Sequence, residues 1–210
     1  VLGAAAASSV LALTTAPAHA TGQTLATTQA ITLTNVGNSN LKDNTTGFAW
    51  YCTKADGTGT ADVGNPPTNP VFRINSLVLV TPSNSPWGGL CSGGYMMIRI
   101  TADTTTPWAF NVTGSTVSGV TPGALTGVKA SIAGDGCRAT LAGPGGIGGT
   151  LSGSYNNASH SLRVGGPGST SNLTVQSVNA DCDPVMINVG DAFSFNFAYS
   201  ISPPVVVTVP

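Results

Sequence analysis

The stretch GVKASIAGDGCRATLAGPGGIGGTLSGSYNNASHSLRV, residues 127–164, decides the fold class of this chain. Apolar residues alternate with polar ones in four short runs, as they do in strands that have one buried face. Asp135-Gly136, between the first two runs, is typical of a two-residue hairpin turn. A Gly-rich segment and Asn156-Asn157 separate the other runs. The stretch therefore predicts four antiparallel strands that follow one another as a meander.

The same alternation continues on both sides of this stretch. In its longest run, AFSFNFAYSI, five large side chains fall on one face: Phe193, Phe195, Phe197, Tyr199 and Ile201. Shorter candidate strands cover 31–36, 48–52, 71–80, 95–102, 108–112 and 173–178, whereas 54–70 is expected to be a loop because Gly, Pro and Asp are dense there. No helical period occurs after residue 20. We therefore predict an all-β fold, an antiparallel β-sandwich of about ten short strands, with a barrel as the lesser option.

The first twenty residues have the composition of an export signal. VLGAAAASSVLALTTAPAHA is apolar and Ala-rich, and it ends in Ala18-His19-Ala20, a small-x-small cleavage pattern. It lacks a start Met and a basic region, so we expect the signal to be truncated at its front. Residues 21–30 are expected to form a polar arm and residues 31–210 a single β-sandwich domain. No later segment is apolar for long enough to predict a membrane span.

Charge limits the function classes. Charged residues make up 7% of the chain and the net charge is −1, against about 25% charged residues in an ordinary globular protein. The chain therefore has no basic surface for nucleic acid. A surface of Thr, Ser, Asn and Gly gives little repulsion between copies, which favours self-association.

Four cysteines in an exported chain predict two disulfides. Three pairings are possible, and we favour Cys52–Cys91 with Cys137–Cys182 because each joins neighbours in sequence order. On the chain-entropy model each disulfide would contribute roughly 4 kcal/mol. No CxxC spacing occurs, which argues against zinc or redox chemistry.

The residues for catalysis are scarce. Outside the signal the chain has one histidine, His160, and it has no glutamate, although general acid–base chemistry usually needs such groups. Asp181 and Asp183 flank Cys182, but the segment lacks the further oxygen ligands of a calcium loop. We therefore expect no enzyme activity, no cofactor and no metal.

Two aromatic residues are candidate ligand contacts. Trp87 stands in the loop SNSPWGG, where no strand pattern would bury it, and Tyr95 is close in sequence. Such rings could stack on a sugar or contact a hydrophobic substrate. The alternative for Trp87 is that it folds back beside Cys91, and this alternative is favoured because large aromatic side chains are usually mostly buried.

Several motifs together resemble a known group of proteins. They are ITLTNVGN, FAWYC, PWAFNVTG, GVKASIAGDGCRATL, GGTLSGSYNN and GDAFSFNFAYSIS, preceded by the Ala-rich leader. The chain resembles small secreted proteins of actinobacteria that have no assigned function, and more loosely the PraB-like surface proteins ("protein activator of alkane oxidation"). The resemblance implies cell-surface or matrix material and carries over no functional residues.

These observations predict a secreted structural protein of the cell surface or extracellular matrix, capable of self-association and without catalytic activity. The alternative is an extracellular binding module for a polysaccharide or hydrophobic substrate. Val205, Val207 and Val209 near the C-terminus would either dock into a neighbouring copy or pair within their own sheet. We favour the second arrangement.

Overall fold

The computed structural model describes residues 28–64, 67–80, 88–93 and 96–210. These residues form fourteen β-strands and one short 3-10 helix, η1 (Pro144–Gly146). The strands are β1 (Thr28–Asn35), β2 (Ser39–Asp43), β3 (Ala49–Cys52), β4 (Lys54–Asp62), β5 (Phe72–Val80), β6 (Arg99–Ala102), β7 (Trp108–Val112), β8 (Val120–Val128), β9 (Ala130–Gly134), β10 (Cys137–Ala142), β11 (Gly149–Asn156), β12 (Ser161–Val164), β13 (Leu173–Val178) and β14 (Ala192–Ser202).

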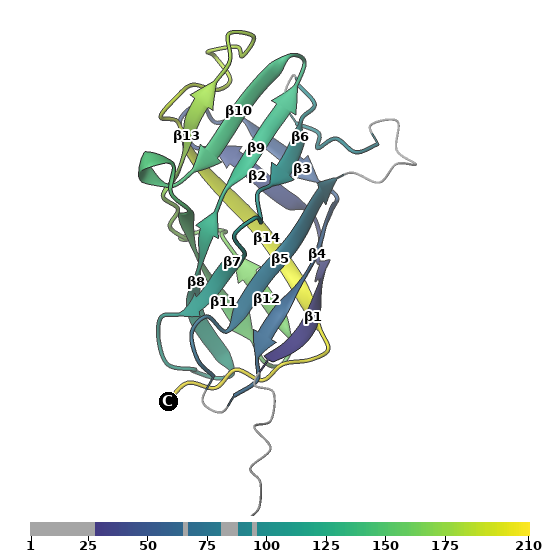
Figure 1. The fold of residues 1–210 in the computed structure, drawn as a ribbon, viewed down its shortest axis with the longest axis vertical. Helices are drawn as coiled ribbons and strands as arrows, with labels where there is room; N and C mark the ends of the chain where they lie inside the picture. Colours follow the sequence, from purple (N-terminus) through teal and green to yellow (C-terminus); the bar gives the residue numbers. More distant parts are fainter. Residues whose placement is uncertain (1–27, 65–66, 81–87, 94–95) are drawn as a thin grey trace, which may run out of the picture.

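All the strands belong to one antiparallel sheet that closes on itself. In hydrogen-bonded order, β1, β4, β5, β7, β8, β11, β12 and β14 form a ring, which closes where β14 pairs with β1. This ring is the lower half of the molecule in Figure 1. The predicted all-β antiparallel fold is confirmed, with fourteen strands in one sheet where about ten were expected.

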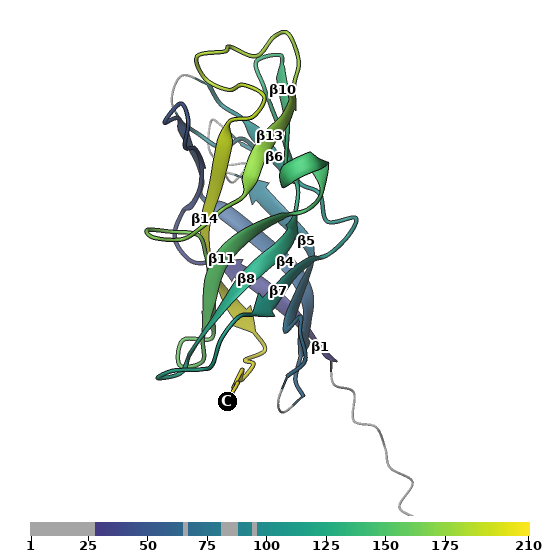
Figure 2. The same ribbon diagram turned by 90° about the vertical axis from the view of Figure 1, so that its left-hand side faces the viewer.

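The upper half of the molecule extends the same sheet. Strands β6, β9, β10 and β13 connect the upper part of β5 to the upper part of β14, and β2 and β3 continue from the other edge of β14. Isolated bridges from Tyr51 to Ser92 and from Cys91 to Ile98 link β3 toward β6. Figures 1 and 2 show β5 and β14 crossing between the two halves.

The interior is filled by large apolar side chains from both halves. The five alternating residues of β14 are all buried, as predicted: Phe193, Phe195, Phe197, Tyr199 and Ile201. Trp50 stacks on Phe193 with the rings 6.3 Å apart, and Phe72 lies 4.9 Å from the ring of Tyr155. The alternation of β14 therefore supplies one continuous side of the core.

The four strands predicted in residues 127–164 are present, but they do not pair with one another in sequence order as a meander. The Asp135-Gly136 turn joins β9 to β10 with both φ angles positive, as its sequence predicts. However, β10 pairs with β9 and β13, whereas β11 pairs with β8 and β12. The Gly-rich segment around η1 carries the chain from the upper to the lower half, so the four strands form two separate hairpins.

The expected loop over residues 54–70 is wrong in its first half, because residues 54–62 form β4. Gly57 and Gly59 lie where β4 approaches β5 so closely that a Cβ would collide with the carbonyl oxygens of Ser76 and Arg73. These glycines serve strand pairing rather than a turn. The polar arm also ends earlier than expected, since β1 begins at Thr28.

The C-terminal segment 203–210 packs against its own chain and crosses the lower end of the ring. Val205 and Val207 are buried, with 2% and 0% of their surface exposed. The Asn157 amide donates to the Val207 carbonyl at 2.8 Å and accepts from the Val207 amide at 2.8 Å. Tyr155 donates its hydroxyl proton to the Val205 carbonyl at 2.7 Å. The segment therefore covers the ring instead of adding a strand to the sheet.

Candidate binding site

One cavity lies on the outer face of β2 and β14. Its volume is about 630 Å³, within the range of ligand pockets. The floor comes from the outward side chains of the two paired strands, in which Asn40 stands opposite Asn196 and Lys42 opposite Ser194. The wall is the connection from β12 to β13, residues 166–171. We call this cavity the β2–β14 cleft.

A glycine lets the wall of the cleft lie close to its floor. Gly165 has φ of 76°, and a Cβ there would collide with the carbonyl oxygen of Phe195. Further along the wall, Thr170 makes two backbone hydrogen bonds to Ser152 on β11. Its carbonyl accepts from the Ser152 backbone amide at 2.9 Å, and its own amide donates to the Ser152 hydroxyl at 2.7 Å. Ser171 donates to the Phe193 carbonyl at 2.6 Å. These bonds fix the wall of the cleft to the sheet.

The chemistry of the β2–β14 cleft is polar, with one positive charge. Among the described residues, the side-chain amides of Asn40 and Asn196 make no hydrogen bond within the chain, so their donors and acceptors are available. Lys42 is exposed, and the one ion pair in the described part of the protein joins Lys54 to Asp56. No carboxylate lines the cleft. Paired amides, hydroxyls and one ammonium group are suited to a polyhydroxylated ligand.

A second hollowed surface lies on the outer face of the upper half. Thr101, Ser131, Thr140 and Ser177 stand side by side across β6, β9, β10 and β13. Thr140 and Ser177 share a hydrogen bond of 2.7 Å. Cavities of about 510 Å³ and 370 Å³ adjoin this row of hydroxyl groups. The long side chains of Lys129, Gln176 and Arg138 also line this surface.

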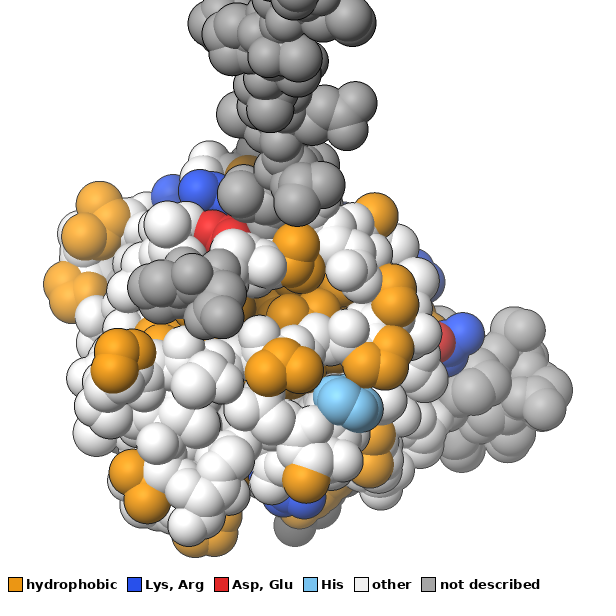
Figure 3. Space-filling model, turned by 90° about the horizontal axis from the view of Figure 1, so that it is seen from below, with side chains coloured by type: hydrophobic (Ala, Val, Ile, Leu, Met, Phe, Trp, Pro, Cys, Tyr) orange, Lys and Arg blue, Asp and Glu red, His pale blue; other side chains and the backbone are white. Residues whose placement is uncertain are grey.

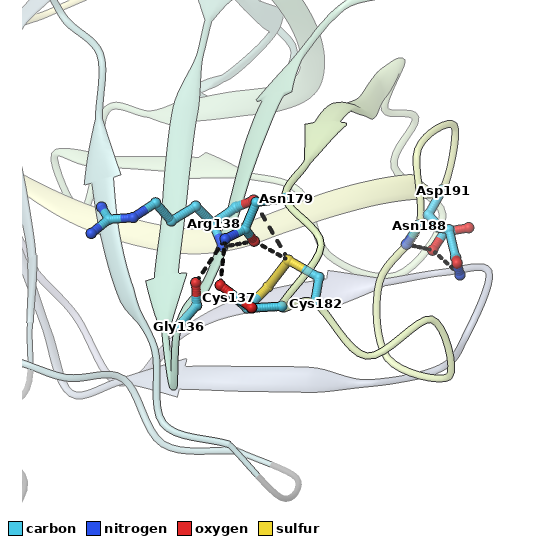
Figure 4. Close-up of a disulfide and its surroundings, with 8 residues drawn as sticks. Gly136, Cys137, Arg138, Asn179, Cys182, Asn188 and Asp191 are labelled. Carbon is cyan, nitrogen blue, oxygen red and sulfur yellow. Dashed lines mark hydrogen bonds between the residues drawn. A yellow bond between two sulfur atoms is a disulfide. The ribbon is translucent and has the colours of Figure 1, made fainter.

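The predicted disulfides are confirmed, Cys52–Cys91 with a Cα–Cα distance of 4.5 Å and Cys137–Cys182 with 4.4 Å. Figure 4 shows how Asn179 holds the second disulfide in place. Its side chain accepts from the Arg138 amide at 2.8 Å and donates to the Gly136 carbonyl at 2.9 Å. These bonds tie the strand that carries Cys137 to the turn that carries Cys182.

The predicted ligand contacts Trp87 and Tyr95 lie outside the described residues. The structure instead draws attention to Asn40 and Asn196, which the sequence analysis missed. Their pairing depends on β2 meeting β14 from the other end of the chain, and no local pattern signals it.

Histidine, cysteine and acidic side chains are spread widely over the described residues. No group of three or more His, Cys, Asp or Glu side chains gathers there. His160 lies in the turn between β11 and β12, with a φ of 48°. Its ring Nδ1 is buried without a hydrogen-bond partner. Among the residues that the structure describes, no helix is long and apolar enough to cross a membrane.

No protein-family model, curated protein or solved structure matches this chain.

Proposed function

We propose that this protein is a secreted, non-catalytic component of the cell surface or extracellular matrix, and that it acts by binding polysaccharide in the β2–β14 cleft. The observation that carries the proposal is the pair of opposed amides, Asn40 and Asn196, in a cavity without carboxylates. Amide groups donate and accept at once, so they can bond to neighbouring hydroxyl groups of a sugar.

Two further observations support an extracellular setting. Two disulfides are typical of proteins that fold in an oxidising compartment. The Ala-rich leader and the resemblance to small secreted surface proteins point to the same setting. A surface with few charges is compatible with dense packing in a matrix.

The test is a pull-down of the oxidised protein on insoluble polysaccharides, with Asn196→Ala as the binding variant. We expect this variant to bind at least about tenfold more weakly. The substitution removes both the donor and the acceptor of the side-chain amide, so the sugar hydroxyl groups bound there would lose those hydrogen bonds. Asn75→Ala is the matched control, since Asn75 is an exposed asparagine on the outer face of β5. Equal binding by the two variants would remove the cleft from the proposal.

The charge of the cleft gives a second comparison. Lys42→Gln keeps a polar side chain and removes the positive charge. Loss of binding to uronic-acid polysaccharides alone would show that Lys42 pairs with a sugar carboxylate. A loss of binding to neutral polysaccharides as well would show that Lys42 bonds to hydroxyl groups.

A binding role for Trp87 stays a separate proposal. If Trp87 stacks on the ligand, Trp87→Ala loses binding at an unchanged melting temperature. A large fall in melting temperature would instead assign Trp87 to the core.

A further inference from the structure

Two buried carboxyl groups meet where the β2–β3 turn contacts the loop before β14. Asp43 ends β2 and Asp191 immediately precedes β14. Asp43 pairs with Phe193 in the sheet, so the two aspartates lie diagonally across neighbouring strands. Asp43 has 0% and Asp191 6% of its surface exposed. Neither side chain lines the β2–β14 cleft.

One oxygen of each carboxyl group is occupied by the local turn. Oδ1 of Asp43 accepts from the amides of Thr45 and Thr46 at 2.8 and 2.9 Å. Oδ2 of Asp191 accepts from the Asn188 amide at 2.6 Å, a contact visible in Figure 4. These bonds hold both carboxyl groups in fixed orientations.

The other oxygen of Asp43 has no N–H or O–H donor. Oδ2 of Asp43 is fully buried and accepts from no such group, although buried polar atoms are nearly always bonded. Its near neighbour is the carboxyl group of Asp191. Burial is the largest cause that raises the pKa of Asp43, and the charge of Asp191 and a carboxyl–carboxyl hydrogen bond to it raise this pKa further. Within the described residues no basic side chain forms an ion pair with either aspartate. The pair therefore lacks a positive charge between its members.

The residues next to Asp43 and Asp191 in the chain carry further oxygen atoms. Thr46 donates its hydroxyl proton to the carbonyl of Met186 at 3.1 Å, which brings loop 183–191 against the β2–β3 turn. The Ala192 amide donates to the Thr45 hydroxyl at 3.0 Å, and the Asn44 amide donates to the Ala192 carbonyl at 2.7 Å. Carboxylate, carbonyl and hydroxyl oxygens are the ligands that calcium prefers.

We propose that Asp43 and Asp191 bind a divalent cation of the calcium type, which joins the β2–β3 turn to loop 183–191. A divalent cation neutralises both buried carboxylates at once, whereas a shared proton leaves one buried negative charge. The site is independent of the β2–β14 cleft and of any polysaccharide. Dissociation constants of about 10⁻⁴ to 10⁻³ M are typical of extracellular calcium modules.

The experiment follows the melting temperature of the oxidised full chain after removal of cations by chelation. Addition of about 10 mM CaCl₂, roughly a hundredfold above the lower of these constants, should raise the melting temperature by about 5–10 °C. NaCl at the same ionic strength should have little effect, and MgCl₂ a smaller one because magnesium demands a stricter geometry. Calorimetric titration should give one calcium ion per chain.

Asp43→Asn and Asp191→Asn are the variants that test the pair. In either variant the new amide can donate to the remaining carboxylate, so we expect a chelated protein at least as stable as the parent and without a calcium response. Asp135→Asn, in an exposed turn, should keep the full response. An unchanged melting temperature of the parent in calcium would overturn the proposal, as would a full response in both pair variants. Stabilisation by acid alone would assign a shared proton instead.

Discussion

At the scale of single residues, two buried tyrosines differ in whether their hydroxyl group has a hydrogen-bond partner. The Tyr155 hydroxyl donates to the Val205 carbonyl, and burial raises its pKa to about 12. Burial and the charge of Asp56 raise the pKa of Tyr199 further, and its hydroxyl has no partner. We expect Tyr155→Phe to lower the free energy of unfolding by about 1–3 kcal/mol, because a buried carbonyl loses its donor. Urea denaturation measures this change.

Tyr199→Phe is the control for this substitution, since it removes the same atom from an equally buried ring. We expect its free energy of unfolding to stay within about 0.5 kcal/mol of the parent or to rise, because no hydrogen bond is lost. Equal losses in the two variants would contradict the role given to the Tyr155–Val205 bond.

Acid should weaken the connection that follows β4. Hydrogen bonds from Thr68 and from the Gly64 amide hold the pKa of the Asp62 carboxyl below its ordinary value of 3.8. A lowered pKa in the folded protein stabilises it at neutral pH, and this contribution is lost as the pH falls below about 4. Asp62→Asn should therefore make the free energy of unfolding less dependent on pH below this value. Parallel pH titrations of the parent and the variant check this, and identical slopes would contradict it.

At the scale of strands, the sequence predicts an element well where one face is buried and side chains alternate. β14 shows this most clearly, because its five large residues fill the core as their spacing indicates. β4 and β8 (VTPGALTGV) were missed because glycine and proline usually signal turns. In both strands a glycine lies where a neighbour leaves no room for a Cβ: Gly59 faces the Arg73 carbonyl and Gly123 the ring of Phe110. Such close approaches depend on partners distant in sequence.

The β2–β14 cleft could not be predicted from the sequence for the same reason. Its floor requires the pairing of Asn40 with Asn196, and its wall is a segment that the sequence marks only as a Gly- and Ser-rich connection. The disulfides were predictable because the leader-like first twenty residues indicated an oxidising compartment and each bond joins cysteines that are neighbours in sequence order. In this chain the sequence therefore predicts the covalent bonds between cysteines, but it does not predict a cleft that depends on which residues face each other across paired strands.

The close approach of β4 to β5 gives a test at the scale of strands. Gly59→Ala should lower the free energy of unfolding by about 1–3 kcal/mol, because the added methyl group forces the two backbones apart. The neighbouring Thr60→Ala, on the outer face of β4, should change it by less than about 0.5 kcal/mol. Urea denaturation of both variants measures the difference, and a harmless Gly59→Ala would show that β4 is not held as described.

At the scale of the whole molecule, the two ends of the sheet are secured by different means. Both disulfides lie in the upper half, whereas the C-terminal segment covers the lower end. Figure 3 views that lower end, where apolar side chains lie among uncharged polar atoms. We expect reduction of the disulfides to raise amide exchange in β3 and β10 before it does so in β8 and β11. Hydrogen exchange with and without reductant measures this order, and a uniform loss of protection would contradict it.

The covered lower end also gives an expectation for association between copies. If Val205 and Val207 docked into a neighbour, deletion of residues 203–210 would abolish assembly. Because both are buried within their own chain, we expect this deletion to lower the free energy of unfolding by about 3–5 kcal/mol and to increase association, since it exposes the apolar end of the ring.

Two point substitutions in the same segment give a matched comparison. Val207→Ala should lower the free energy of unfolding by about 2 kcal/mol, whereas Val206→Ala should leave it almost unchanged because the Val206 side chain is 67% exposed. Negative-stain microscopy of the oxidised protein across a concentration series separates the two cases. If the parent protein forms assemblies and the deletion variant does not, the hypothesis that the C-terminal segment docks into a neighbouring copy would be supported instead.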